Sequence, residues 1–270
     1  MSHPAIKILQ GDSVEMLKAI PDASVHLVVT SPPYDSLRSY GGNLKWDFEG
    51  TALELFRVLV PGGAVCWNVN DSVVDGSETL TSCDQKSFFH RKAGFCIHDT
   101  MIWEKTHVAC PDSTRYHQMF EYVFVLSKGK PSTFNRISDR RNKWAGATPF
   151  SYNSKRLVNG DIKRTREVDD RGAIAEFGSR SNVWKGNSRA QEEPCVTLPQ
   201  PAMMPKWLVR DLILSWSNIG DTVLDPFAGS GTTGRMAFEN NRNAILIEIN
   251  PDYIPIIEQQ ISNVTPDLIL

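Results

Sequence analysis

Residues 222–248 read TVLDPFAGSGTTGRMAFENNRNAILIE, and they contain the pattern of two strands joined by a turn and a helix. The apolar residues at 222–224 predict a strand, and those at 244–247 predict a second one. Between them, small and turn-forming residues at 225–231 predict a tight turn, and the apolar spacing at 232–239 predicts a helix. Strands that alternate with helices in this way indicate a parallel sheet.

The turn in this stretch carries a signal for a bound cofactor. Gly229 and Gly231 allow a backbone to approach a ligand closely at a helix N-terminus. Glu248 lies 17 residues past Gly231 at a strand end, where a carboxylate can accept hydrogen bonds from ribose hydroxyls. With Gly234 the glycines match the bare Gly-x-Gly-x-x-Gly spacing, which is equally compatible with an ordinary strand–helix turn. No lysine follows them, so the turn is not a phosphate-binding P-loop.

A second motif follows the apolar run VHLVVT at residues 25–30, which is typical of a buried parallel strand. The strand is predicted to end at Ser31-Pro32-Pro33-Tyr34, at the edge where open α/β sheets bind ligands. The two prolines fix their own φ angles and lack N–H donors. They leave a rigid row of carbonyl acceptors beside a hydroxyl and an aromatic ring. Such a site suits an amino group on a flat ring, although a simple strand-terminating turn is the alternative.

The rest of the chain repeats the alternation of strands and helices. Further strands are predicted at residues 6–9, 64–69 and 122–126, and further helices at 13–20, 51–59, 207–216 and 252–261. We therefore predict an α/β fold with a doubly wound, mainly parallel sheet.

Charge is unevenly distributed along the 270 residues, whose net charge is −2. Residues 131–190 hold 13 Lys and Arg against 6 Asp and Glu, whereas the remainder holds 16 against 25. The basic segment has little hydrophobic periodicity, so we expect an insertion that contacts phosphates, with a solvated loop as the alternative. It divides the chain into residues 1–130, 131–190 and 191–270.

Composition disfavours several other classes of protein. No apolar run approaches the roughly 20 residues that span a bilayer, and the N-terminus shows no signal-peptide pattern. The five cysteines are scattered without a Cys-x-x-Cys pair, so we expect no disulfide framework or zinc site and a location in the reducing cytoplasm. The histidines have no metal-ligand spacing, and no metal is expected.

Together, the two motifs resemble those of the amino-methylating DNA methyltransferases. That family carries Asp/Asn/Ser-Pro-Pro-Tyr/Phe/Trp as its catalytic motif and Phe-x-Gly-x-Gly as its S-adenosylmethionine motif. The resemblance covers most of the chain and includes segments 10–13, 57–63, 120–124 and 201–221. Gln200 departs from the His or Lys that often precedes Pro-Ala in the family, a departure that concerns a minor contact.

The order of the motifs is similar to the β arrangement of that family. The catalytic motif precedes the cofactor motif, with the basic segment between them, in a circular permutation of the usual order. The resemblance implies a Rossmann-like methyltransferase fold, S-adenosylmethionine as cofactor and double-stranded DNA as substrate. It also implies a homodimer, and it leaves open a cognate restriction enzyme as partner.

The resemblance assigns roles to the catalytic motif. Ser31 Oγ and the Pro32 carbonyl would accept hydrogen bonds from the target amino group, with Pro33 holding the turn. Tyr34 would stack on a base flipped out of the duplex.

It also assigns the cofactor site. Asp225, Phe227, Gly229 and Gly231 would hold the methionine end of S-adenosylmethionine, Glu248 its ribose, and Asp12 its adenine amino group. Asp12 has an alternative role as the N-cap of the helix that begins at Ser13.

The basic segment corresponds to the target-recognition region of the family. Candidate phosphate or base contacts are Arg136, Arg140, Arg141, Lys143, Arg156, Lys163, Arg164 and Arg166. For Trp144 and Trp184 we expect packing in a core rather than recognition.

The acceptor base is expected to be adenine, at N6, with cytosine N4 as the close alternative. The family's cytosine enzymes favour Ser-Pro-Pro, but its adenine enzymes also accept Ser at the position of Ser31. Three other functions fit less of the chain: a protein glutamine methyltransferase, a nucleotide-dependent oxidoreductase and a non-catalytic DNA-binding protein.

Overall fold

The computed structural model of the chain describes residues 3–33, 46–107, 113–147, 150–168, 172–187 and 203–264. They form two compact units, one made of Met1–Asn135 with Asn182–Leu270 and the other of Arg136–Ser181.

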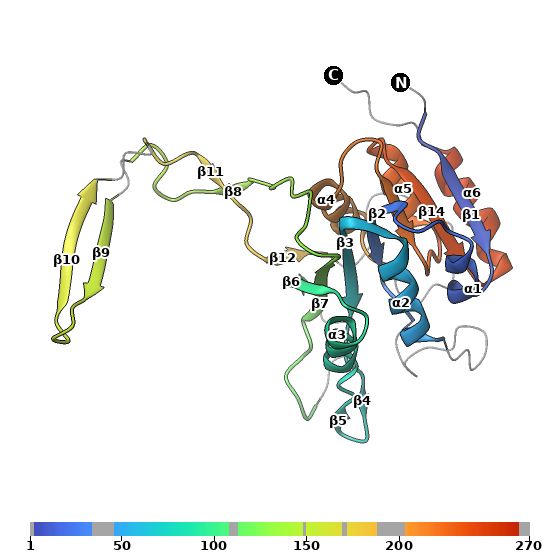
Figure 1. The fold of residues 1–270 in the computed structure, drawn as a ribbon, viewed down its shortest axis with the longest axis horizontal. Helices are drawn as coiled ribbons and strands as arrows, with labels where there is room; N and C mark the ends of the chain where they lie inside the picture. The colour runs from blue at the N-terminus through green and yellow to red at the C-terminus, as the bar shows by residue number, and fades with distance from the viewer. Residues whose placement is uncertain are drawn as a thin grey trace. The chain divides into compact units, whose positions relative to one another are not determined.

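The larger unit is built on an eight-stranded sheet with the order β1-β14-β13-β2-β3-β7-β6-β12. The strands are β1 (Ile6–Gln10), β2 (Val25–Thr30), β3 (Leu59–Val69), β6 (Cys96–Lys105), β7 (Phe120–Ser127), β12 (Val183–Gly186), β13 (Thr222–Asp225) and β14 (Asn243–Glu248). Only β7 runs against its neighbours, β3 and β6, and the other pairs are parallel (Figure 1).

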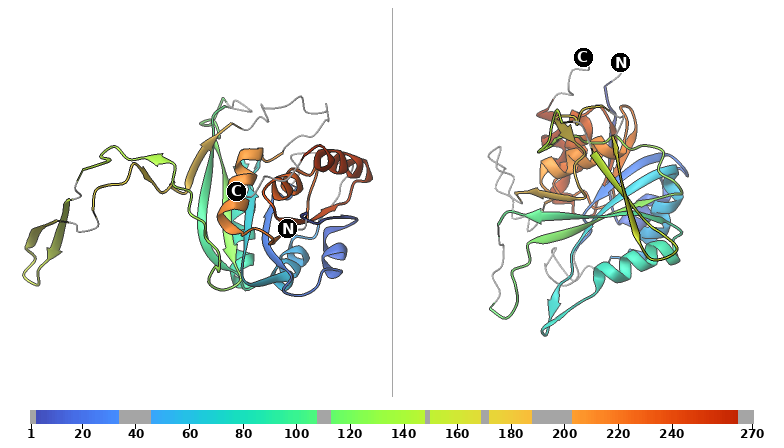
Figure 2. Two further views of the ribbon diagram at one scale, coloured as in Figure 1. Left: turned by 90° about the horizontal axis from the view of Figure 1, so that it is seen from above. Right: turned by 90° about the vertical axis from the view of Figure 1, so that its left-hand side faces the viewer.

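Helices cover both faces of this sheet (Figure 2). One layer holds α1 (Ser13–Lys18), α2 (Phe48–Val58) and α3 (Thr81–Arg91), and the other holds α4 (Lys206–Trp216), α5 (Thr232–Glu239) and α6 (Ile254–Ser262), which follows the short η1 (Pro251–Tyr253). The prediction of a doubly wound, mainly parallel sheet is therefore confirmed. Within the described ranges, no helix is both long and apolar enough to traverse a bilayer.

The core lies where β2 and β3 cross the centre of the sheet. Nearly all of β2 is buried, because a central parallel strand is covered on both faces. On β3, Trp67 is fully buried against Phe89 of α3, with ring centroids 5.1 Å apart. The Trp67 indole N–H donates to Gln85 Oε1 at 2.8 Å, so the only polar atom of this ring has a partner inside the core.

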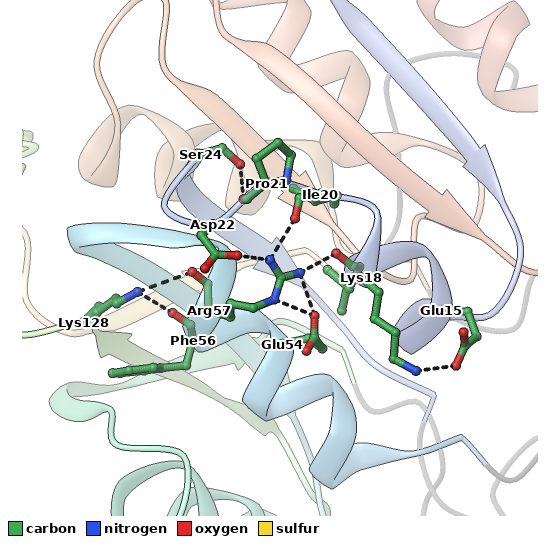
Figure 3. Close-up of polar contacts among 11 residues, drawn as sticks. Glu15, Lys18, Ile20, Pro21, Asp22, Ser24, Glu54, Phe56, Arg57 and Lys128 are labelled. Carbon is green, nitrogen blue, oxygen red and sulfur yellow. Dashed lines mark hydrogen bonds and ion pairs between the residues drawn. The ribbon is translucent and has the colours of Figure 1, made fainter.

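Arg57 joins the first helix to the second (Figure 3). Its guanidinium donates to the carbonyls of Leu17 and Ile20 at 2.8 and 2.9 Å, and it also bonds the carboxylates of Asp22 and Glu54. Leu17 and Ile20 lie at the end of α1, where carbonyls run out of helical donors. The Leu17 carbonyl also accepts from Ile20 N at 2.9 Å, so Arg57 adds a second donor there and a side-chain donor to the Ile20 carbonyl. The pKa of Arg57 is raised above its usual value, chiefly by the hydrogen bond to Glu54.

Two features of this unit were not predicted. Helix α3 was missed because its sequence is polar and because its N-terminal Ser82 is capped from a distance by Asp71, through bonds of 2.8 and 2.6 Å. A small hairpin of β4 (Val73–Val74) and β5 (Ser77–Glu78) precedes it, turning through Asp75 and Gly76 with positive φ angles of 49° and 80°.

The smaller unit consists of paired strands rather than an unstructured loop. Strands β8 (Arg140–Arg141) and β11 (Phe177–Gly178) pair antiparallel, and β9 (Phe150–Arg156) pairs with β10 (Ile162–Val168). The smaller unit covers fewer residues than the basic segment 131–190, because residues at both ends of that segment belong to the larger unit. Asn135 bonds the carbonyls of Leu214 and Ser217 at the end of α4, and β12 joins the sheet beside β6.

Candidate active site

Four strand ends meet at one edge of the sheet. β1, β14, β13 and β2 are adjacent and parallel, so their carboxyl ends bring the sequence-predicted residues together. Gly11 N donates to the carbonyl of Glu248 at 3.0 Å, and Ala228 N donates to that of Ile247 at 2.9 Å. These bonds tie the loop after β1 and the Gly-rich turn to the end of β14.

Asp225 links the two sequence motifs. Its carboxylate accepts hydrogen bonds from Thr30 Oγ1 at 2.6 Å, Thr233 Oγ1 at 2.7 Å and Phe227 N at 3.1 Å. Thr30 ends the strand before Ser31, and Thr233 lies in the first turn of α5. The side chain of Asp225 is buried, and burial raises its pKa, although the bonds from Thr30 and Thr233 oppose that rise.

The Gly-rich turn has the backbone geometry that only glycine adopts readily. Gly229 and Gly231 have φ angles of 52° and 88°, in the left-handed region. A Cβ at Gly231 would lie 3.0 Å from the Ile257 side chain, and one at Gly234 would lie 2.4 Å from Leu246. The three glycines therefore shape the turn and let α5 pack closely on β14.

Glu248 reaches from the end of β14 to the Gly-rich turn. Its Oε2 accepts from Gly229 N at 2.7 Å, and its Oε1 accepts from Asn250 N at 2.8 Å. The side chain is buried, with a relative exposure of 9% for the residue, and burial raises its pKa. The two bonds from backbone N–H groups fix the orientation of the Glu248 carboxylate, and each oxygen keeps a lone pair that can accept from a further donor.

Asp12 acts as the N-cap of α1. Its Oδ1 accepts from Val14 N at 2.9 Å and from Glu15 N at 3.2 Å, the bonds expected of a capping aspartate. The capping role considered from the sequence is thus present, and a contact with a cofactor stays a prediction.

The catalytic motif is described except for its last residue. Thr30 and Pro32 are buried, whereas Ser31 and Pro33 are half-buried at the end of β2. Tyr34 lies outside the described residues. Ser31 follows directly on Thr30, whose hydroxyl bonds Asp225 at the start of the Gly-rich turn.

Phe227 is anchored in an aromatic cluster. Its ring centroid lies 5.0 Å from that of Trp46 and 6.4 Å from that of Trp67, in edge-to-face geometry. The half-buried ring thus fixes the turn against the core, next to the strand ends.

Three residues of the site were not predicted from the sequence. Thr30 and Thr233 hold the carboxylate of Asp225, and Met203 Sδ accepts a bond from Ser230 Oγ at 2.9 Å. The threonines adjoin the motifs, but nothing local indicates that their hydroxyls converge on one carboxylate 195 residues along the chain from Thr30.

The predicted DNA-contacting residues lie in the smaller unit, and some of their side chains are engaged within it. Arg140 donates to the Ser179 carbonyl at 3.1 Å, and Arg141 lies 3.5 Å from the Glu176 carboxylate. Arg156 and Lys163 are exposed near the tip of the β9–β10 hairpin. Arg164 and Arg166 occupy backbone positions on β10, and Arg136 is exposed at the start of the unit.

The two tryptophans differ. Trp184 is buried, with 7% exposure, as predicted. The expectation that Trp144 packs in a core is wrong, because its exposure is 66% and Lys143 Nζ lies over its ring at 5.4 Å. The small unit is too thin to enclose a ring of that size.

No group of three or more His, Cys, Asp or Glu able to hold a metal occurs among the described residues.

Comparison with known proteins agrees with this geometry. The family model described as DNA methylase, for N6 and N4 methyltransferases, matches residues 25–259. Orphan methyltransferase M.BamHII of Bacillus amyloliquefaciens is 44% identical over 254 residues, covering 92% of each chain.

Two solved structures extend the comparison. The PvuII DNA methyltransferase, described as cytosine-N4-specific, has a TM-score of 0.67 at 18% identity and covers 96% of this chain and 89% of its own. A candidate DNA modification methylase from Thermus thermophilus, complexed with S-adenosyl-L-methionine, has a TM-score of 0.60 at 25% identity and covers 99% and 100%. The family match spans both motifs and the strands that carry them, and the chain belongs to the N6/N4 family of DNA methylases.

Proposed function

We propose that the chain transfers a methyl group from S-adenosylmethionine to the exocyclic amino nitrogen of a base in a specific sequence of double-stranded DNA. One observation carries the proposal: the 2.6 Å bond from Thr30 to Asp225 joins the catalytic strand end to the cofactor turn. A reaction between a base and a cofactor needs both binding motifs at one place. Membership of the DNA methylase family supports the same reaction.

The residues present fit the proposed cofactor. Glu248 would accept hydrogen bonds from the ribose hydroxyls, because its two bonds to backbone N–H groups leave acceptor capacity on both oxygens. Asp225, Phe227, Gly229 and Gly231 would hold the methionine end, since the open glycine backbone admits a ligand there.

Asp12 would meet the adenine amino group of the cofactor. Its two capping bonds are both to Oδ1, so the carboxylate is oriented by α1 while it can still accept another donor.

When bound, S-adenosylmethionine supplies an electrophilic methyl group on a positively charged sulfur. Ser31 Oγ and the Pro32 carbonyl would accept hydrogen bonds from the two hydrogens of the target amino group, which directs the nitrogen lone pair toward that methyl. Both oxygens also stabilise the positive charge that develops on the nitrogen. Pro33 keeps the turn rigid, and Tyr34 would stack on the flipped base. No strong base is needed, because the proton can leave after the methyl transfer.

Replacing Ser31 with alanine tests this catalytic role. Ser31→Ala should reduce methyl transfer on the order of 100-fold or more by loss of one positioning acceptor. Its affinity for S-adenosylmethionine should match that of the wild type, because Ser31 belongs to the base site. Full activity in the variant would show that Ser31 has no role in methyl transfer. An equal loss of affinity for S-adenosylmethionine would show that Ser31 contributes to the cofactor site and not to the base site.

For the acceptor base, adenine N6 is the proposal from the sequence, and cytosine N4 is the second candidate. Ser31 favours cytosine by resemblance to the family's cytosine enzymes, and the family itself covers both nitrogens. Chemically, the motif accepts hydrogen bonds from either amino group. Mass spectrometry of nucleosides from DNA methylated in vitro decides between them: N6-methyladenine is expected, and N4-methylcytosine alone would overturn that choice.

The basic segment 131–190 is proposed as the target-recognition region, between a catalytic half at residues 1–130 and a cofactor-binding half at residues 191–270. Support comes from its charge and from exposed cations such as Arg156 and Lys163. A homodimer is proposed because one small subunit offers limited surface to grip a duplex. A cognate restriction enzyme stays a prediction, and the relative M.BamHII is named an orphan.

A further inference from the structure

The hairpin of β9 and β10 is a two-stranded ribbon of opposite charge to DNA. Each strand has seven residues, paired from Arg156–Ile162 at the tip to Phe150–Val168 at the base (Figure 1). Seven residues span about 23 Å at the rise of an antiparallel strand. Two-stranded β-ribbons enter DNA in the major or the minor groove, and apolar wedges between base steps are known for proteins bound in the minor groove.

The tip of this ribbon is rigidly folded. The Gly160 N–H donates to the Leu157 carbonyl at 2.9 Å, and the Leu157 N–H donates to the Asp161 carbonyl at 2.7 Å. The Asn159 side chain bonds Asp161 twice, through its amide donor at 2.8 Å and its oxygen at 3.2 Å. Gly160 supplies the positive φ, 88°, that the turn requires.

The same tip exposes apolar side chains. Val158 has a relative exposure of 110%, Ile162 of 59% and Leu157 of 40%. Scattered single apolar residues on a surface are ordinary, but here three of them share one short apex, residues 157–162. A turn held by four hydrogen bonds therefore presents a small apolar wedge.

Basic residues flank the wedge. Arg156 and Lys163 are exposed next to it, and the sequence places Lys155, Arg164 and Arg166 further along the two strands. The acidic Asp161 is bonded to Asn159.

We propose that the β9–β10 ribbon lies in a groove of duplex DNA and that Leu157 and Val158 insert as an apolar wedge that unstacks a base step. The inference rests on the proposed function only in taking duplex DNA as the partner. Flanking cations would hold phosphates while the wedge gains burial among the bases, a combination that DNA-bending proteins use. The rigid turn removes the ordering entropy that a flexible tip would lose on insertion.

Binding to two DNA duplexes tests the wedge. One is a fully paired duplex of mixed sequence, and the other is the same duplex with regularly spaced mismatches that are already partly unstacked. The wild-type protein should prefer the mismatched duplex by about 10-fold, because less unstacking is required. In the double variant Leu157→Ser, Val158→Ser, this preference should fall several-fold; the remainder is expected from base flipping, which is also easier at a mismatch. Val158→Ile is the matched control and should keep the preference.

A second variant separates the wedge from the charge. Arg156→Ala with Lys163→Ala should bind both duplexes more weakly, keep the preference, and lower the slope of log affinity against log salt by about 2. The serine variant should keep the wild-type slope. All four side chains are exposed, so unchanged thermal unfolding is expected for both variants.

An equal preference for mismatched DNA in the wild type and the serine variant would overturn the wedge. Loss of the salt dependence in the serine variant would also overturn it, because the tip would then act through charge. Methyl transfer to DNA is measured separately with the same protein preparations. If the wild type methylates no DNA, that result counts against the proposed function and not against the wedge.

Discussion

Glu248 offers the sharpest test of the cofactor site. The carboxylate is buried at the end of β14 and is held by the N–H groups of Gly229 and Asn250. Glu248→Ala removes the proposed ribose acceptor and also leaves those two N–H groups without it. Glu248→Gln keeps the shape of the side chain and one acceptor oxygen, but its NH2 group would face one of those two N–H donors.

The size of the effect follows from the chemistry of the contact. A hydrogen bond between a buried carboxylate and a neutral hydroxyl contributes about 1.5–3 kcal/mol, which corresponds to roughly a 10- to 100-fold change in affinity. Glu248→Ala should weaken S-adenosylmethionine binding toward the upper end of this range. Glu248→Gln should also fall within this range, because one neutral acceptor oxygen remains while its NH2 group opposes the N–H of Gly229 or Asn250.

Calorimetric titration of S-adenosylmethionine measures both variants, with thermal unfolding as the check on folding. Glu258→Gln is the matched control, because Glu258 lies exposed on α6 and should leave the affinity unchanged. Unchanged affinity in folded Glu248→Ala would show that Glu248 does not bind the cofactor. An equal loss in the Glu258 control would show that the effect is one of net charge.

Three further predictions can be tested by titration, urea unfolding and light scattering: they concern the raised pKa of Glu248, the contacts of Arg57 and the expected dimer. Because burial raises the pKa of Glu248, its carboxylate should take up a proton at a higher pH than an ordinary glutamate does. Affinity for S-adenosylmethionine should therefore fall as the pH is lowered, and it should depend less on pH in Glu248→Gln. The same raised pKa means that the native state binds the proton more tightly than the unfolded state does. The contribution of Glu248 to the free energy of unfolding should therefore increase as the pH falls from neutral. Urea unfolding of the wild type and Glu248→Gln at several pH values checks the direction of this change. Arg57→Ala should lower the unfolding free energy by about 2–3 kcal/mol, because the Ile20 carbonyl and the Glu54 carboxylate lose the guanidinium donor, and an unchanged urea midpoint would contradict this. Light scattering at micromolar concentration should show a dimer, and a monomer both with and without DNA would rule it out.

Much of the fold, and the place of the candidate site at one edge of the sheet, could be predicted from local sequence pattern. The run at 25–30 is apolar throughout because β2 is covered on both faces, and the glycines at 229 and 231 mark a turn that requires positive φ. Parallel strands place their carboxyl ends at one edge, so the meeting of Ser31, Asp225 and Glu248 at that edge could be expected from the sequence.

The remaining features depend on contacts that sequence pattern does not encode. The bond from Thr30 to Asp225 joins residues 195 positions apart, and the cap of α3 comes from Asp71, eleven residues before Ser82. The β9–β10 hairpin had a local signal, Asn159-Gly160, that favours tight hairpin turns, but its strands lack the alternation of a half-buried sheet.

Transfer of a labelled methyl group from S-adenosylmethionine to DNA tests whether the protein methylates an exocyclic amino nitrogen. Duplex DNA is incubated with the protein and S-adenosylmethionine carrying a deuterated methyl group, then digested to nucleosides for mass spectrometry. The labelled methyl should appear on an exocyclic amino nitrogen, as N6-methyladenine or N4-methylcytosine, and Ser31→Ala should lose that signal. No label in DNA, or label on carbon 5 of cytosine, would show that the protein does not methylate an exocyclic amino nitrogen of DNA.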